Sequence, residues 1–336
     1  MILAGDIGGT NARLASFKLE GDRLACALEK DYPSQEHASL EEIVTQFIAE
    51  HGVKVERACF GIAGPVENGR AVTPNLPWVV DASQLASRLG LERVLLINDL
   101  EANTYGIAVL GPKDFAVLNE GTPEPHGGLA VIAAGTGLGE AGAFWDGKMH
   151  CPVPCEGGHC DFAPRNALET ELLHHLLHKY KHVSYERVLS GAGLVNIYKF
   201  LRDTGRAQEA ASLAAGMRHG NAAAAISKAA LEGGSPLAEQ ALDLFVSLYG
   251  AEAGNLALKF KATGGVFVGG GIAPKIIEKL KGPVFMQAFT AKGRMKALLE
   301  AMPVKVILND KTALLGAARR AALGDGSNGQ CVSDRG

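Results

Sequence analysis

Apolar runs alternate with polar turns along most of the chain. Two of these runs are interrupted by a glycine-rich turn: residues 2–17 contain the turn 5–11, and residues 129–144 contain the turn 135–139. Each predicts two strands joined at a tight turn. Other short apolar runs without helical spacing predict strands at 23–27, 57–62, 93–99 and 304–308, and the segment 265–272 is predicted to be a strand that runs into glycines.

Apolar residues three and four positions apart predict helices in the remaining segments. Residues 40–51 form the clearest case, because Ser39 and Glu42 make a capping box at the start. Further helices are predicted at 81–90, 100–110, 168–180, 193–202, 222–231, 237–259 and 313–323, and one is expected to begin at Pro274. The tail 324–336 is rich in Gly, Ser, Asn and Asp, which predicts disorder.

The strand–turn–strand pattern occurs twice, the second time about 126 positions after the first, which indicates an internal duplication. We therefore expect an α/β protein of two related lobes with a ligand cleft between them. The predicted small lobe combines residues 1–109 with 300–323, and the predicted large lobe is 110–299.

Composition restricts the classes of function. The chain has 336 residues, 47% of them hydrophobic, which is enough for two cores. Its formal net charge of −3 gives no electrostatic support for a nucleic-acid partner. No apolar run approaches the ~20 residues that span a bilayer, and no basic leader precedes the first strand. We therefore expect a cytoplasmic protein without a membrane partner.

Six cysteines are present, and in a reducing cytoplasm they are expected to be free thiols. Five potential zinc ligands lie close together: His150, Cys151, Cys155, His159 and Cys160. Their spacing is not the paired C-x-x-C of a structural zinc ribbon. Thiols that line a pocket are the favoured interpretation, and structural zinc is the alternative.

The glycine-rich turns are candidate phosphate sites, because glycine lets backbone N–H groups approach an anion closely. The hydroxyl groups of Thr10 and Thr136 would add donors, and the carboxylate of Asp6 indicates an intervening Mg²⁺ ion. One such turn alone is also explained by a tight hairpin, whereas two favour phosphate binding. The candidate residues are Gly5, Asp6, Ile7, Gly8, Gly9, Thr10 and Asn11 in the first turn, and Gly135, Thr136, Gly137 and Gly139 in the second.

A third glycine segment, Gly269, Gly270 and Gly271, follows an apolar strand. It would let a nucleoside lie against the backbone, or it would allow a helix and a strand to pack closely.

Asp99 is the candidate general base, since it ends a buried strand where ligand sites of open α/β sheets collect. An aspartate before a helix is equally a favoured N-cap. Asn98 is either a turn residue or an amide that binds a ligand hydroxyl group.

Glu156 and His159 flank two glycines, so a sharp turn would aim both side chains at one point. Carboxylate and imidazole groups suit a polyhydroxyl ligand, although an exposed turn explains the same pattern. Glu186 begins a helical stretch, where its carboxylate either binds a ligand or stabilises the helix dipole.

Taken in order, these segments resemble the proteobacterial-type glucokinases of the actin/hexokinase/Hsp70 ATPase superfamily. The resemblance extends from about residue 2 to 323, and E-G-G-H-x-D-F-A-P and E-R-V-L-S-G are its most specific motifs. The chain lacks the C-x-C-G zinc motif of the repressor/ORF/kinase (ROK) sugar kinases, which supports the branch without zinc. The segments that carry the resemblance are 5–14, 97–99, 133–139, 156–164, 186–194, 264–272 and 314–318.

The resemblance implies two actin-like (RNase H-like) lobes, each a mixed sheet with helices. It implies transfer of the ATP γ-phosphoryl group to the 6-hydroxyl group of D-glucose, at the entry of glycolysis. In that reaction Asp99 would be the base, and Asn98, Glu156, His159 and Glu186 would bind the other hydroxyl groups. The two glycine turns would hold the ATP phosphates with Asp6 near Mg²⁺, and residues 269–271 would lie near the adenosine.

A homodimer is also expected. The alternatives are a kinase for mannose, fructose or glucosamine, a different phosphoryl donor, and a sugar-sensing regulator. A regulator would need a DNA-binding helix-turn-helix before the first strand, where Met1 leaves no room.

Overall fold

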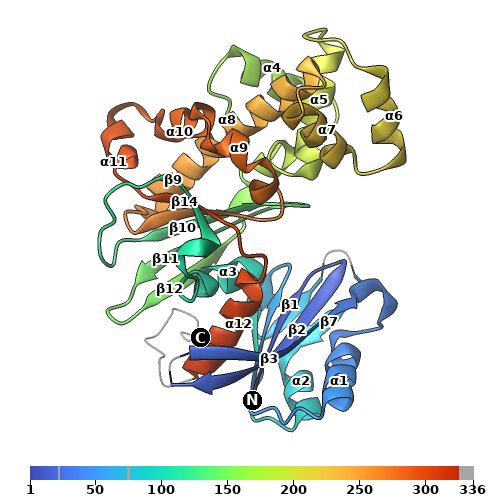
Figure 1. Ribbon diagram of the computed structural model, residues 1–336, viewed down its shortest axis with the longest axis vertical. Coiled ribbons are helices and arrows are strands. Elements are labelled where there is room, and N and C mark those ends of the chain that lie inside the picture. Colours follow the sequence, from blue (N-terminus) through green and yellow to red (C-terminus); the bar gives the residue numbers. More distant parts are fainter. Residues whose placement is uncertain (22, 74–75, 325–336) are drawn as a thin grey trace. The chain divides into compact units, whose positions relative to one another are not determined.

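The computed structural model describes residues 1–21, 23–73 and 76–324 (Figure 1). The chain forms two compact units. The first contains Met1–Pro112, Asp146–Pro154 and the chain from Asn309 on, and the second contains Lys113–Trp145 and Cys155–Leu308. These units differ from the predicted lobes, because 146–154 belongs to the first and the strand at 304–307 to the second. Of the predicted disordered tail 324–336, all but Gly324 lies outside the described residues.

The first unit contains a mixed five-stranded sheet in the order β3-β2-β1-β4-β8. Its strands are β1 (Ile2–Ile7), β2 (Asn11–Glu20), β3 (Arg23–Pro33), β4 (Arg57–Ile62) and β8 (Leu95–Asn98). β1 runs antiparallel to β2 and parallel to β4, and β4 runs parallel to β8. The ladder of β1 and β2 closes with Ile7 opposite Ala12, which confirms the first strand–turn–strand prediction.

Helices pack on this sheet through two apolar clusters. The other elements of the first unit are α1 (Leu40–His51), α2 (Ala82–Leu89), α3 (Asp99–Ile107), α12 (Thr312–Leu323), η1 (Ser34–Glu36) and a small sheet of β5 (Val66–Glu67), β6 (Arg70–Val72) and β7 (Val79–Asp81). One cluster contains Leu40 and Phe47 of α1, and the other contains residues of α3 and α12. A Cβ atom at Gly316 would lie 1.7 Å from the Ala102 carbonyl oxygen. α3 and α12 therefore pack backbone to backbone, which fixes the helix that begins at Asp99.

The capping box of α1 is present in a shifted form. The Ser39 hydroxyl group accepts a hydrogen bond from the Glu42 N–H at 3.3 Å. The Glu42 carboxylate accepts from the N–H of Ala38 at 2.8 Å. Two N–H groups at the helix start are thus satisfied, as the sequence predicts.

The second unit contains another mixed sheet, in which five strands follow the order β11-β10-β13-β14-β9. They are β9 (Phe115–Asn119), β10 (Leu129–Ala134), β11 (Leu138–Trp145), β13 (Gly265–Gly269) and β14 (Val304–Ile307). β10 pairs antiparallel with β11, closing with Ala134 opposite Leu138, so the second strand–turn–strand prediction is confirmed. β13 runs parallel to β10 and β14. β12 (His150–Cys155) leads the chain from the first unit into the second.

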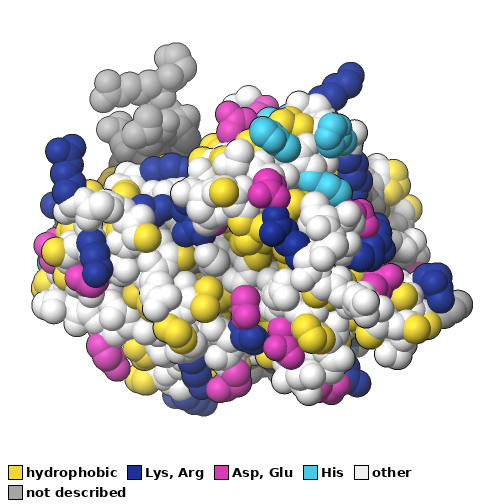
Figure 2. Space-filling model, turned by 90° about the horizontal axis from the view of Figure 1, so that it is seen from above, with side chains coloured by type: hydrophobic (Ala, Val, Ile, Leu, Met, Phe, Trp, Pro, Cys, Tyr) yellow, Lys and Arg dark blue, Asp and Glu magenta, His cyan; other side chains and the backbone are white. Residues whose placement is uncertain are grey.

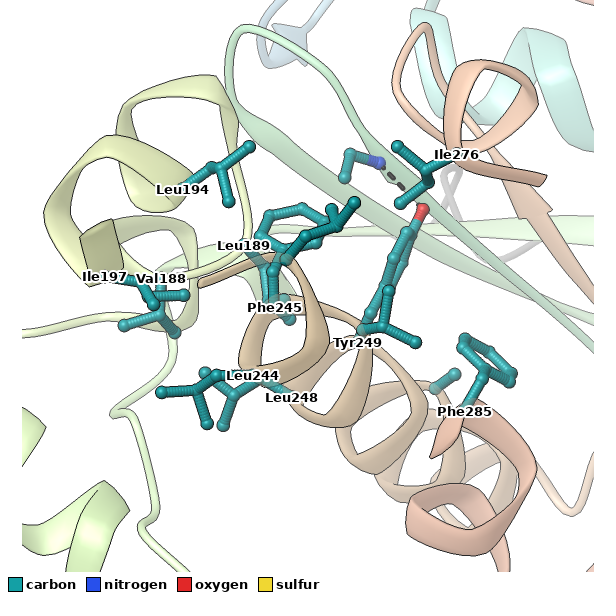
Figure 3. Close-up of a cluster of buried hydrophobic side chains, with 14 of the residues drawn as sticks. Val188, Leu189, Leu194, Ile197, Leu244, Phe245, Leu248, Tyr249, Ile276 and Phe285 are labelled. Carbon is teal, nitrogen blue, oxygen red and sulfur yellow. Dashed lines mark hydrogen bonds between the residues drawn. The ribbon is translucent and has the colours of Figure 1, made fainter. Parts of the chain in front are cut away.

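A large helical part completes the second unit. Its elements are α4 (Ala167–Leu177), α5 (Gly191–Asp203), α6 (Ala211–His219), α7 (Ala222–Leu231), α8 (Pro236–Phe260), α9 (Ile277–Lys281), α10 (Pro283–Thr290), α11 (Lys296–Glu300), η3 (Gly157–His159), η4 (Tyr185–Arg187), η5 (Ala273–Ile276) and η6 (Gly293–Met295). α8 supplies many of the side chains of the core. Figure 3 shows Phe245, Leu248 and Tyr249 of this helix among apolar side chains of neighbouring elements. Its start is capped by the Ser235 hydroxyl group, which accepts from the Ala238 N–H.

Several predicted boundaries were wrong. The strand predicted at 23–27 continues to Pro33 because it pairs along its whole length with β2. In the segment 265–272, predicted as a strand that runs into glycines, the strand ends at Gly269, and Gly270 adopts a φ of +80°. The helix expected from Pro274 is split into η5 and α9. In the part of the chain that the structure describes, no helix has the length and apolar character needed to cross a bilayer.

Candidate active site

The first unit gathers its candidate residues at one edge of its sheet. The parallel strands β1, β4 and β8 place Ile7 opposite Ile62, and Ile62 opposite Asn98. The first glycine turn and Asn98 therefore lie at the carboxyl ends of β1 and β8, two parallel strands separated by β4, at the edge where α/β sheets bind ligands. Ser34 supports the turn: its N–H donates to Thr10 O and its hydroxyl group donates to Gly8 O.

The N-cap of α3 is Asn98. Its Oδ1 accepts from the Leu100 N–H at 2.8 Å, and its Nδ2 donates to Gly64 O at 3.0 Å. Asp99 was predicted as the last strand residue, but it is the first residue of α3, and its Oδ1 also accepts from the Leu100 N–H. Because Asn98 supplies the cap, the carboxylate of Asp99 is not required for it.

Asp6 lies in a charged cluster that the sequence prediction missed. Burial raises the pKa of the Asp6 carboxyl group to about 6, and the positive charge of Arg13, its partner across β1 and β2, opposes the rise. Arg13 is held by Asp31 at 2.8 Å and by Asp310 at 3.2 Å. Hydrogen bonding to Asp31 is the main reason that the pKa of Arg13 is raised. With Glu29, whose carboxylate lies 3.8 Å from Arg13 Nε, four carboxylates thus accompany one guanidinium group beside the first glycine turn.

This cluster suits a cation that is shared with a ligand. No group of three or more His, Cys, Asp and Glu side chains among the described residues is arranged to hold a metal ion alone. Mg²⁺ commonly binds through one or two carboxylates together with substrate phosphates and water. The donor set around Asp6 fits that mode, because its buried carboxylate lacks a full counter-charge.

In the second unit, the second and third glycine segments lie side by side. Ala133 pairs with Gly269, and the N–H of Ile272 donates to Ala134 O. A Cβ atom at Gly270 would lie 2.3 Å from Ala134 O, so the close approach requires glycine.

Tyr249 of α8 forms hydrogen bonds with the residues at the start of both segments. Its hydroxyl oxygen accepts from the Ala134 N–H at 3.1 Å, and its hydroxyl group donates to Gly269 O at 3.1 Å. Figure 3 shows the first of these bonds at the buried hydroxyl group. The sequence gives no sign of this role, since Tyr249 occupies an ordinary apolar position of a helix.

The predicted sugar-binding residues surround Leu138, which ends the second glycine turn. The Leu138 N–H donates to Glu186 Oε2 at 3.1 Å. A Cβ atom at Gly158 would lie 2.0 Å from Leu138 O, so η3 packs directly on this residue. His159 Nε2 lies 4.0 Å from Glu156 Oε2, and both side chains are 61% exposed. Glu156, His159 and Glu186 therefore lie on segments that meet the second glycine turn.

The five potential zinc ligands of 150–160 do not form a metal-binding group within the described residues. Cys151 is buried, Cys155 is half-buried and Cys160 is exposed, and all three are free thiols. The Cys155 Sγ atom donates to Glu140 O.

Charge on the surface follows the balanced composition. On the face seen in Figure 2, Asp and Glu side chains stand among the Lys and Arg side chains.

Comparison with known proteins identifies the family of the chain. Residues 3–323 match the family model described as Glucokinase. A glucokinase of Nostoc sp. is 44% identical over 96% of this chain and 99% of its own length. The crystal structure of a glucokinase from an Antarctic psychrotroph has a TM-score of 0.83 and 30% identity, covering 96% of this chain and 98% of that chain.

A ROK family glucokinase from Streptomyces griseus, solved in complex with glucose and AMPPNP, has a TM-score of 0.64 at 23% identity, covering 96% and 99% of the two chains. At that identity the likeness shows the fold alone. The fold is the expected α/β actin-like architecture. On the match over nearly its whole length, this chain belongs to the glucokinase family.

Proposed function

We propose that this protein transfers the γ-phosphoryl group of ATP to the 6-hydroxyl group of D-glucose, forming glucose 6-phosphate and ADP. One observation carries the proposal. Around Leu138, a glycine turn suited to phosphate meets Glu156, His159 and Glu186, which are suited to hydroxyl groups. Residues suited to a phosphoryl donor and residues suited to a sugar are thus adjacent in one unit.

Asp99 is the proposed general base. It removes the proton of the 6-hydroxyl group while that oxygen attacks the γ-phosphorus atom, and the bond between the γ-phosphorus atom and the ADP oxygen breaks. Such proton transfer contributes about 10²–10⁴ to a rate. The other hydroxyl groups are bound by Asn98, Glu156, His159 and Glu186, whose oxygens and nitrogens accept or donate hydrogen bonds.

The glycine turns hold the ATP phosphates in this proposal, and Gly269, Gly270 and Gly271 lie against the adenosine. Mg²⁺ supplies positive charge to the phosphates when it is bound. Asp6 is the residue that would hold the ion, and Arg13 is the positive charge that faces its carboxylate.

We further infer a cytoplasmic homodimer acting at the entry of glycolysis. Light scattering coupled to size-exclusion chromatography tests the dimer directly. A monomer at micromolar concentration would contradict it.

Product formation with a panel of hexoses tests the activity. Purified protein is assayed with glucose, mannose, fructose and glucosamine, using ATP, ADP or polyphosphate, with and without Mg²⁺. We expect the highest kcat/KM with glucose and MgATP, and loss of turnover when EDTA removes the metal. A higher kcat/KM for another hexose would assign the chain to the alternative substrate.

A further inference from the structure

Glu140 is a buried carboxyl group for which the proposed reaction has no use. It follows the second glycine turn on β11 and is 1% exposed. Neither of its carboxyl oxygens has a hydrogen-bond partner among the described residues. An unpaired carboxyl group in such a place is costly, so its retention in a core needs a reason.

The carboxyl group of Glu140 lies against the turn that carries Glu156 and His159. A Cβ atom at Gly157 would lie 2.0 Å from Glu140 Oε2 and 2.9 Å from its Cδ. Glu140 therefore occupies the space that a side chain at position 157 would need. The carboxyl group of Glu140 thus packs directly against the backbone of the turn that carries the two polar side chains.

The surroundings of Glu140 disfavour a charge on it. Glu252 of α8 is fully buried and is paired with Lys259 Nζ at 3.5 Å and with Asn255 Nδ2 at 2.7 Å. Burial, followed by the negative charge of Glu252, raises the pKa of Glu140 to about 8, and Lys259 opposes the rise. Besides Glu252 and Lys259, the titratable groups that interact with Glu140 are Tyr249 of α8 and Cys155 of β12, whose pKa values are themselves raised by burial.

The same network reaches the second predicted sugar-binding element. Asn255 Nδ2, which donates to Glu252, lies 3.1 Å from the hydroxyl oxygen of Tyr185. Tyr185 begins η4 and immediately precedes Glu186. A new negative charge at Glu140 would thus act on the residues that support η3 and on those that support η4.

We propose that Glu140 is a positioning residue of the sugar-binding site: its carboxyl group fills the space beside Gly157 and fixes the turn that carries Glu156 and His159. The inference rests on the proposed binding of glucose by these two residues. Ionisation of Glu140 places a second negative charge beside Glu252 in an apolar interior. Water must then enter or the turn must move, and either change misaligns the sugar-binding side chains.

The test compares the KM for glucose, the KM for ATP and kcat at pH 7 and pH 9. In the wild-type protein we expect the KM for glucose to rise about threefold or more over this range, with a smaller change in the KM for ATP. Glu140→Gln keeps the size of the side chain and removes its charge. This variant should have a wild-type KM for glucose at pH 7 and lose the rise at pH 9.

Two further variants separate positioning from mere packing. Glu140→Ala empties the space beside Gly157 and should raise the KM for glucose about tenfold at both pH values. Glu252→Gln removes the neighbouring charge and leaves Lys259 available to Glu140, so the rise in KM should move to lower pH. Glu232→Gln, at an exposed position after α7, is the control and should behave as the wild type. The inference is overturned if Glu140→Gln keeps the wild-type pH dependence.

Hydrogen exchange of the segment 156–162 distinguishes this inference from the proposed function. After correction for intrinsic rates, exchange in this segment should increase from pH 7 to pH 9 in the wild type but not in Glu140→Gln; equal behaviour of the two proteins overturns the inference. Glu156→Gln and His159→Ala should each raise the KM for glucose. If both leave that KM unchanged while Glu140→Gln alters the exchange, the turn is positioned by Glu140 but does not bind glucose, which refutes the proposed function of the turn alone.

Discussion

At the scale of single residues, Asp99 combines a fixed backbone with a side chain that the helix does not need. α3 begins at Asp99, while Asn98 caps the helix and α12 packs on it closely. The carboxylate is therefore held at a defined point at the edge of the sheet. Because Asn98 already caps the helix, we expect an amide at position 99 to leave the surrounding backbone unchanged.

Asp99→Asn is expected to lower kcat by about 10²–10⁴ or more, because the amide cannot accept the proton of the 6-hydroxyl group. The Kd for glucose should stay within about threefold, since the amide keeps the size and one acceptor oxygen. Steady-state kinetics and calorimetric titration with glucose measure the two effects. Glu92→Gln, at an exposed position before β8, is the control. Near-normal turnover of Asp99→Asn would refute the role of Asp99 as the base.

The adjacent glycines Gly270 and Gly271 differ in the role that we expect for them: Gly270 allows close packing of the backbone, and Gly271 leaves space for a ligand. Gly270 has a φ of +80° and would place a Cβ atom against Ala134, whereas a Cβ atom at Gly271 would meet no protein atom within 4 Å. Gly270→Ala should destabilise the protein by about 1–3 kcal/mol. Gly271→Ala should leave the melting temperature unchanged and raise the KM for ATP but not for glucose, because only a bound nucleotide would meet the new methyl group. An unchanged KM for ATP in Gly271→Ala would contradict the placement of adenosine at this segment.

At the scale of elements, α8 holds the ends of β10 and β13 through one hydroxyl group. Tyr249→Phe removes that group and leaves the buried Ala134 N–H without its partner. We expect a loss of about 1–3 kcal/mol in the free energy of unfolding. The KM for ATP should increase more than the KM for glucose, since the two glycine segments lose their common support. Tyr32→Phe, which removes a hydroxyl group from the partly exposed bond to Glu50, is the control for the substitution itself. Equal effects on both KM values would show that the hydroxyl group acts on overall stability alone.

The sequence predicts elements well where one local signal is strong. Both strand–turn–strand units appear as expected, because glycines interrupt apolar runs that have no helical spacing. β3 was predicted too short, since its second half, Leu28 to Pro33, is polar and is ordered by pairing with β2. Short elements such as α6 and α11 were not predicted, because they carry too few periodic positions.

In the candidate site too, residues with a strong local pattern could be predicted, and residues brought together only by folding could not. The glycine turns and the Glu156–His159 motif are visible in the sequence, because each consists of neighbouring residues with a distinctive pattern. Arg13, Asp31 and Asp310 come together from three distant segments, and no spacing in the sequence indicates their contact. Tyr249 and Glu140 are similarly hidden, since their roles arise from packing between α8, β11 and the turns.

At the scale of the whole molecule, buried carboxyl groups determine how stability changes with pH. Burial raises the pKa of Asp6 to about 6, of the partly buried Glu101 to about 7 and of Glu140 to about 8. An acid whose pKa is higher in the folded state binds more protons there than in the unfolded chain. The free energy of unfolding then falls as the pH rises from the unfolded value, about 4, to the folded value. Exposed carboxylates with lowered pKa values, such as Glu50 at about 2, are already ionised at pH 5, so their contribution to the free energy of unfolding does not change above that pH.

We therefore expect the ligand-free protein to be less stable at pH 8.5 than at pH 5.5. Each pKa unit within this window corresponds to about 1.4 kcal/mol, so a difference of several kcal/mol is expected. Urea unfolding followed by circular dichroism at the two pH values measures it. Glu140→Gln should flatten the decline, because the amide has no charge to gain between pH 5.5 and pH 8, whereas Glu232→Gln should retain the wild-type decline. A stability that is constant or increases over this window would show that these three carboxyl groups are not desolvated in the folded protein. A decline that Glu140→Gln leaves intact would place its origin in Asp6 and Glu101 instead, the two carboxyl groups of the first unit.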